Sequence, residues 1–63
     1  MRAITNKQEK YIINLIKKDR SIKTVDDLKE EDWVAIGEMN YSEVLWANVN
    51  GFISDMRFKL LNN

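Results

Sequence analysis

The sequence contains no cysteine, no histidine and no proline, and its two glycines stand apart from each other. Without cysteine and histidine the chain has no disulfide and lacks the usual zinc ligands. The usual catalytic pairs of a nucleophile with a base are missing for the same reason. Isolated glycines form no phosphate-binding loop, and their scarcity together with the missing proline leaves no linker that would divide the chain. These absences predict one domain spanning residues 1–63, with no cofactor, no metal and no enzymatic activity.

The sequence also lacks long apolar runs. No stretch approaches the roughly 18 apolar residues that a membrane span needs. No apolar segment follows Met1 and Arg2, so we expect no signal peptide. We therefore expect a protein of the cytoplasm, or of the host cytoplasm if a phage encodes it, with no membrane partner.

What the chain does have is enough apolar material for a small core. Its 63 residues are 44% hydrophobic, with six aromatic side chains, which is more than a disordered chain would carry. A domain this short buries only about 60% of its unfolded surface, so self-association is a further source of stability. We accordingly expect a folded domain and leave a homo-oligomer open.

The apolar spacing predicts an all-α fold with three or four helices. Thr5-Asn6-Lys7-Gln8 has the pattern of a capping box that opens the first helix, and Ile4 precedes it as a hydrophobic staple. We expect the last helix to begin with Ser42 as its N-cap, and Gly51 to allow either close approach of another helix or a kink. The apolar stripe of that helix is Leu45, Val49, Phe52, Ile53, Met56 and Leu60. Two longer helices with a short helical segment between them form the expected bundle.

The middle of the chain is less regular. Thr24 to Asp27 resembles a second helix start, and we expect that short helix to reach about Glu30. A further helical stretch is expected to begin at Glu31 and to stop near Gly37. Whether residues 24–38 form one bent helix or two short ones stays open.

Charge is balanced overall but unevenly distributed. Residues 1–23 carry seven basic and two acidic side chains, and residues 24–63 carry three basic and eight acidic ones. At 100° per residue, one stripe of the first helix collects the nucleic-acid-binding candidates Lys7, Lys10, Asn14, Lys17 and Lys18. A zero net charge argues against a dedicated nucleic-acid binder, so a merely bipolar domain remains the alternative.

A second set of residues is a candidate protein interface. Acidic side chains cluster before the first tryptophan, and exposed aromatic residues are common anchors in interfaces. Both tryptophans also suit a small core, and Phe58 lies off the apolar stripe, as a dimer contact would. The candidates are Asp26, Asp27, Glu30, Glu31, Trp33 and Phe58.

The opening of the chain resembles a known kind of module. Thr5-x-Lys7-Gln8-x-x-Tyr11-Ile12-x-x-Leu15 is similar to the T-x-K-Q-x-x-Y-I-x-x-L opening of small helical modules in phage and mobile-element proteins. Those modules often form the C-terminal end of larger DNA-recombination or replication proteins. Residues 39–43 and Ile53-x-x-Met56 are similar to the second half of the pattern, whereas Val44-Leu45-Trp46 replaces its small residue pair.

The resemblance implies an accessory role near DNA metabolism and no catalytic residues. It leaves three hypotheses: a nucleic-acid or protein binder, a phage inhibitor that presents acidic and aromatic groups to a host protein, and a homo-oligomeric structural module. The sequence does not decide between a protein and a nucleic acid as the partner.

Overall fold

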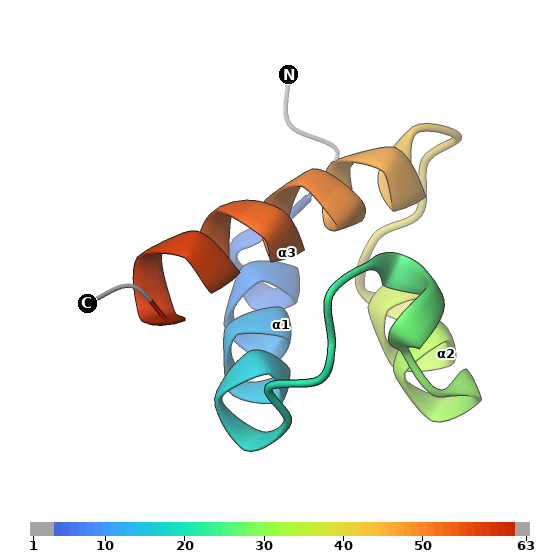
Figure 1. Cartoon of the computed structure of the whole chain (residues 1–63). Coiled ribbons are helices and arrows are strands. Elements are labelled where there is room, and N and C mark those ends of the chain that lie inside the picture. Colours follow the sequence, from blue (N-terminus) through green and yellow to red (C-terminus); the bar gives the residue numbers. More distant parts are fainter. Residues whose placement is uncertain (1–3, 62–63) are drawn as a thin grey trace.

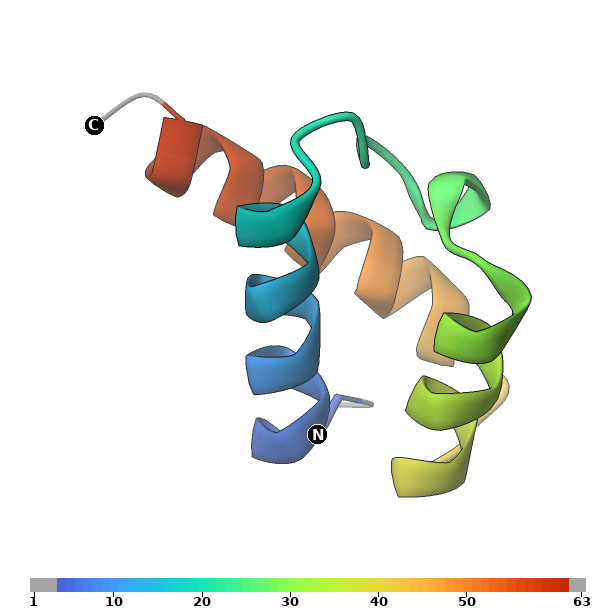
Figure 2. The same cartoon turned by 90° about the horizontal axis from the view of Figure 1, so that it is seen from below.

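The computed structural model describes residues 4–61, which fold into three α-helices and one short 3₁₀ turn with no strand among them. The elements are α1 (Asn6–Lys18), η1 (Val25–Asp27), α2 (Glu30–Met39) and α3 (Leu45–Leu61). Helices α1 and α2 run antiparallel on the same side of α3, which crosses both of them (Figures 1 and 2). The all-α prediction is confirmed, and residues 24–38 form two separate elements rather than one bent helix.

The start of α1 follows the predicted cap. The Thr5 hydroxyl accepts a hydrogen bond from the backbone N–H of Gln8 at 3.2 Å, and the Gln8 side chain accepts one from the N–H of Thr5 at 2.8 Å. Ile4 is buried just before the cap. Because these contacts are local in sequence, this end of the helix was readable from the residue types alone.

The core lies where the three helices meet. Its buried apolar side chains come from all three helices, from the residue before the cap of α1 and from the connection between α1 and α2: Ile4, Ile12, Ile16, Ile22, Leu28, Ile36, Leu45, Val49 and Ile53. The predicted stripe of α3 supplies three of them, and its other members Phe52, Met56 and Leu60 pack around the edge. The two tryptophans also pack at the edge, half-buried, with ring centroids 4.4 Å apart.

Three local expectations were wrong. Gly37 does not end α2, which continues through it to Met39, and η1 ends before Leu28 instead of reaching Glu30. Ser42 does not cap α3, which begins at Leu45; within residues 4–61 the Ser42 hydroxyl has no hydrogen-bond partner. Instead, the Ser42 carbonyl accepts from the N–H of Leu45 in a turn that precedes the helix.

Gly51 also has a different setting from the expected one. It lies on the exposed side of α3, and an added Cβ would meet nothing within 4 Å in the described part of the chain. The predicted close approach of another helix is therefore not made by α1 or α2.

Polar side chains of α3 hold the connection between α1 and α2 in place. Arg57 donates through Nη1 to the carbonyl oxygens of Arg20 and Ile22, the latter at 2.9 Å. The Asn50 side chain accepts from the N–H of Val25 at 3.0 Å. These bonds satisfy backbone groups of a connection that has little regular structure of its own.

Candidate functional site

The orientation of α1 is set by buried contacts on its inner side. Ile12 and Ile16 are fully or almost fully buried, and Gln8 is 0% exposed on the same side of the helix. Residues three and four apart share a helix face, so burying these three turns the opposite side of α1 outward.

Gln8 connects α1 to α2. Besides its capping contact with Thr5, its Nε2 donates to the carbonyl oxygens of Ile36 and Asn40, each at 2.7 Å. The last four carbonyls of a helix lack partners within the helix, and Ile36 is among them in α2. One side chain therefore caps the start of α1 and the end of α2.

Tyr11 makes a second contact between the two helices. Its hydroxyl donates to Oδ1 of Asp32 at 2.7 Å, and Oδ2 of Asp32 accepts from the N–H of Lys29 at 3.3 Å. The pKa of Tyr11 is raised to about 12. The hydrogen bond to the carboxylate is the largest cause, and burial is the second. Thr5, Gln8, Tyr11 and Ile12 of the motif thus all have structural roles.

The five candidate nucleic-acid-binding residues lie together on the outer side of α1, which we call the basic face: Lys7, Lys10, Asn14, Lys17 and Lys18. All five are exposed, and none of the four lysines forms an ion pair with another described residue. From the first lysine to the last the face spans about 16 Å at 1.5 Å per residue. Its ammonium groups are available to an external anion.

One edge of the basic face borders a polar cleft. The cleft has a volume of about 450 Å³ and lies between α1 and the segment that leads into α2. Asn14 and Lys18 line it from the basic face, opposite the carboxylates of Asp27, Glu31 and Asp32. The positive potential of the basic face is therefore weaker around Lys18 than around Lys10.

The candidate protein-interface residues do not gather into one surface. Asp26, Glu30 and Glu31 are exposed, but the Asp27 carboxylate accepts hydrogen bonds from the N–H groups of Lys23 and Thr24. Trp33 is half-buried against Trp46, and its Nε1 donates to the Leu28 carbonyl. Phe58 is 72% exposed, but it lies on α3 rather than beside the acidic residues.

Two exposed carboxylates, those of Asp19 and Asp27, stabilise the connection between α1 and α2. Hydrogen bonds from the hydroxyl and the N–H of Ser21 lower the pKa of Asp19 below its usual 3.8. Those from the N–H groups of Lys23 and Thr24 lower the pKa of Asp27 in the same way. In their charged form, the two carboxylates stabilise the turns in which they lie.

Residues 4–61 also bear on metal binding and on insertion into a membrane. No group of three or more acidic side chains there is arranged to hold a metal ion. In the same range, no helix combines the length and the apolar character that crossing a membrane requires.

The sequence did not predict two long-range contacts that hold the fold together, one made by Gln8 and one by Arg57. The long-range role of Gln8 was hidden because its capping role already accounted for the residue. Arg57 was counted only as a charge, and no local pattern marks a guanidinium that reaches carbonyls 35 and 37 positions away.

Comparison with known proteins adds no relative. The chain matches no protein-family profile, no curated protein and no solved structure. The resemblance of its opening to phage and mobile-element modules therefore stays a prediction.

Proposed function

We propose that this chain is a small non-catalytic accessory protein of phage or mobile-element type that binds the phosphate backbone of a nucleic acid through the basic face. The observation that carries the proposal is the exposure of four lysines, unpaired within the described residues, on one side of one helix. Lysine ammonium groups bind phosphates as point charges and give affinity without reading sequence. The proposal places the protein in the host cytoplasm.

The zero net charge of the chain is compatible with this proposal. The acidic side chains belong mainly to η1, α2 and the turn before α3, whereas α1 contributes Glu9 as its single carboxylate. Because exposed charges more than about 10 Å apart are largely screened at 0.1 M salt, a local basic face can bind in a neutral protein. Binding is then expected to be weak and insensitive to sequence.

Salt dependence provides the direct test. Binding of labelled duplex and single-stranded oligonucleotides is measured by fluorescence anisotropy between about 50 and 200 mM salt. Four phosphate contacts predict a slope of log K against log salt of roughly −3 to −4 for duplex DNA. Binding that is independent of salt would contradict the proposal.

A charge reversal on the basic face has a matched control. Lys10→Glu with Lys17→Glu should abolish binding, because both lysines are exposed on the outer side of α1. Lys23→Glu with Lys29→Glu changes the net charge equally at exposed positions outside this face and should retain most of the binding. Equal losses in the two double variants would show a non-specific effect of net charge instead of a site.

A protein partner is the second candidate. It is favoured by the exposure of Asp26, Glu30 and Glu31, and by Tyr41 and Val44, which are 64% and 58% exposed in the turn before α3. Capture from host lysate with and without nuclease separates the two candidates. A partner that is retained after nuclease favours protein binding, and loss of every partner favours nucleic acid.

A further inference from the structure

A hollow lies beside the basic face, between the C-terminal end of α1 and the C-terminal end of α3. Its volume is about 170 Å³, and it is lined by Ile16, Lys17, Arg20, Leu60 and Leu61. Three of these side chains are apolar, two are cationic, and none of these lining residues carries a carboxylate. Lys17 also belongs to the basic face, so the hollow is continuous with that surface.

The two cations of this hollow are free to meet a ligand. Arg57 of α3 donates to the carbonyl oxygens of Arg20 and Ile22, which holds the backbone of Arg20 against α3. The guanidinium of Arg20 is exposed and pairs with no carboxylate among residues 4–61. The ammonium group of Lys17 is exposed and unpaired within the same range. Both charges are therefore available to an anion that enters from solvent.

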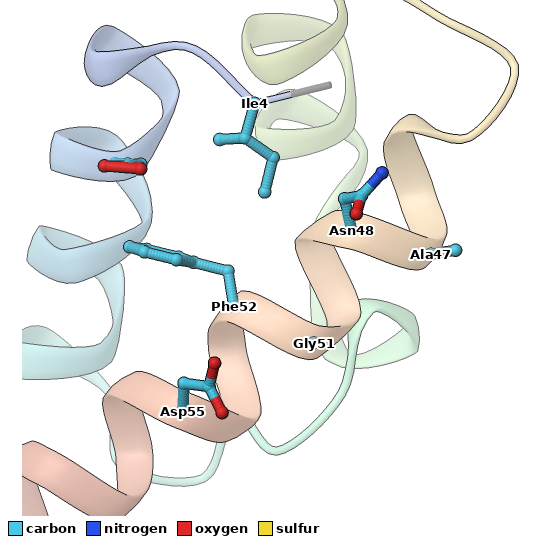
Figure 3. A pocket seen from close by; sticks show the side chains of 7 residues that line it. Ile4, Ala47, Asn48, Gly51, Phe52 and Asp55 are labelled. Atoms are coloured by element: carbon cyan, nitrogen blue, oxygen red, sulfur yellow. The ribbon is translucent and has the colours of Figure 1, made fainter. Parts of the chain in front are cut away.

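Two larger hollows of the surface contain carboxylates. One, of about 250 Å³, lies on the flank of α3 beside Phe52 and is also lined by Glu9 and Asp55 (Figure 3). The other is the polar cleft described above, which also contains several carboxylates. At 100° per residue, Lys17 and Lys18 lie at the two edges of the basic face, and the cleft borders the edge at Lys18. Phosphates are therefore favoured along the edge at Lys17, where the hollow adds positive charge.

The apolar side chains of the hollow restrict which nucleic acid fits it. In a duplex the bases are stacked inside, so a protein surface meets phosphates, sugars and the edges of the grooves. Phosphates gain nothing from contact with Leu60 and Leu61. An unpaired base of a single strand is different, because it can lie against apolar side chains or an arginine plane while a neighbouring phosphate binds a cation. The combination of leucines with two cations therefore favours a single strand.

We propose that the hollow receives one unpaired base of a single-stranded nucleic acid whose backbone follows the basic face. The base lies against Leu60, Leu61 and the guanidinium plane of Arg20, and Lys17 binds a phosphate next to it. This inference rests on the proposed function, because the lysines of the basic face supply the backbone contacts. It adds a preference for single strands over duplexes. Every base has a flat face that can make such a contact, so dependence on sequence stays weak.

Three labelled probes of equal length separate the base contact from the backbone contacts. They are a thymidine strand, its duplex with an adenosine strand, and a strand with the same phosphates but abasic residues in place of the bases. Fluorescence anisotropy should show several-fold tighter binding of the thymidine strand than of either other probe. Salt-dependent binding that is equal for all three would leave the proposed function intact and overturn the base contact. Failure of all three probes to bind would overturn both.

Leu61 allows a test in both directions. It lines the hollow but is not among the side chains packed on the core, so its replacement tests the contact and not the fold. Leu61→Gln should weaken binding of the thymidine strand several-fold, and Leu61→Phe should strengthen it, because an aromatic ring stacks on a base. Neither should change the salt slope, since no phosphate contact is altered. Val44→Gln is the matched control, because Val44 is 58% exposed in the turn before α3. Affinity that is unchanged in both Leu61 variants would overturn the proposal.

Arg20 tests the plane and the charge separately. Arg20→Lys keeps the charge and removes the flat guanidinium, so it should weaken binding of the thymidine strand and leave binding of the abasic strand unchanged. Arg20→Ala should weaken binding of both strands. Lys23→Ala is the control, since it removes an exposed cation that does not line the hollow. Melting temperatures should stay close to that of the unmodified protein in all three variants. Equal losses in Arg20→Ala and Lys23→Ala would show a general effect of charge and overturn the proposal.

Discussion

The side-chain amide of Gln8 donates a 2.7 Å hydrogen bond to the carbonyl oxygen of Ile36, 28 positions later in the chain. The same amide group also bonds to the carbonyl of Asn40 and to the N–H of Thr5, so each of its polar atoms has a partner. A fully buried glutamine is stable only under that condition, because an unpaired polar group in the interior is costly. The contact joins the beginning of α1 to the end of α2.

Replacing Gln8 should therefore destabilise the fold more than removing its neighbouring cap. Gln8→Leu leaves two carbonyl groups and one N–H without their partner, at about 1–3 kcal/mol for each buried group that water cannot reach. Thr5→Ala loses one capping bond, worth about 1 kcal/mol. Urea unfolding followed by circular dichroism measures both. Equal losses in the two variants would show that the bonds to α2 contribute nothing.

The hydrogen bond between Tyr11 and Asp32 predicts a high phenol pKa. In a Tyr41→Phe background Tyr11 is the only tyrosine, and ultraviolet titration should find its pKa near 12. Asp32→Asn should move the pKa of Tyr11 towards its usual 10, because the charge that holds the proton is removed. A pKa near 10 in the protein with Asp32 intact would argue against this contact.

The same shift makes stability depend on pH in the alkaline range. The folded protein holds the Tyr11 proton more tightly than the unfolded chain does, so this contribution is complete below pH 10 and is lost as the pH rises to about 12. In Tyr11→Phe, the unfolding free energy should fall less steeply through this range. Thermal unfolding at a series of pH values makes the comparison.

Asp27 predicts the opposite sign in acid. Its pKa is lowered in the folded protein by the N–H groups of Lys23 and Thr24, so its contribution is present above pH 3.8 and is lost as the pH falls below that value. Asp27→Ala should therefore be less stable than the unmodified protein at neutral pH, and the difference should shrink in acid. A difference in melting temperature that stays constant down to low pH would contradict the assignment.

The lysines of the basic face should contribute unequally to nucleic-acid binding. Lys10→Ala should reduce the salt slope by about one, as expected for a lost phosphate contact. Lys18→Ala should reduce it less, because Lys18 lines the cleft that also contains Asp27, Glu31 and Asp32. Anisotropy titrations at several salt concentrations measure both slopes. A larger loss at Lys18 would place the bound strand along the cleft instead.

The sequence predicted what depends on neighbours three and four residues apart. The cap at Thr5, the inner side of α1 and the buried stripe Leu45, Val49 and Ile53 all follow from helical spacing, and the structure confirms them. The outward direction of the basic face follows from the same spacing, because burying one side of a helix exposes the other.

The predictions that failed depend on backbone geometry and on hydrogen bonds that residue types alone do not show. Gly37 was expected to end α2, but α2 continues to Met39, where Gln8 supplies the donors for its terminal carbonyls. Ser42 has the residue type of an N-cap, yet the chain makes one more turn before α3 begins. The candidate interface residues do not form one surface, because Asp27 and Trp33 are hydrogen-bonded to backbone groups. A list of residue types does not reveal such hydrogen bonds.

The two polar contacts of α1, made by Gln8 and Tyr11, also fix the rotation of the helix about its own axis. A turn of the helix by about 100° would replace Ile12 with Ile13 in the core, but it would also bring Lys17 to the place of the buried Ile16. Such a turn would carry Gln8 and Tyr11 away from Ile36 and Asp32 together, breaking both hydrogen bonds. The direction in which the lysines point is thus fixed by the buried isoleucines together with an amide and a phenol, whose hydrogen bonds form at only one rotation of the helix.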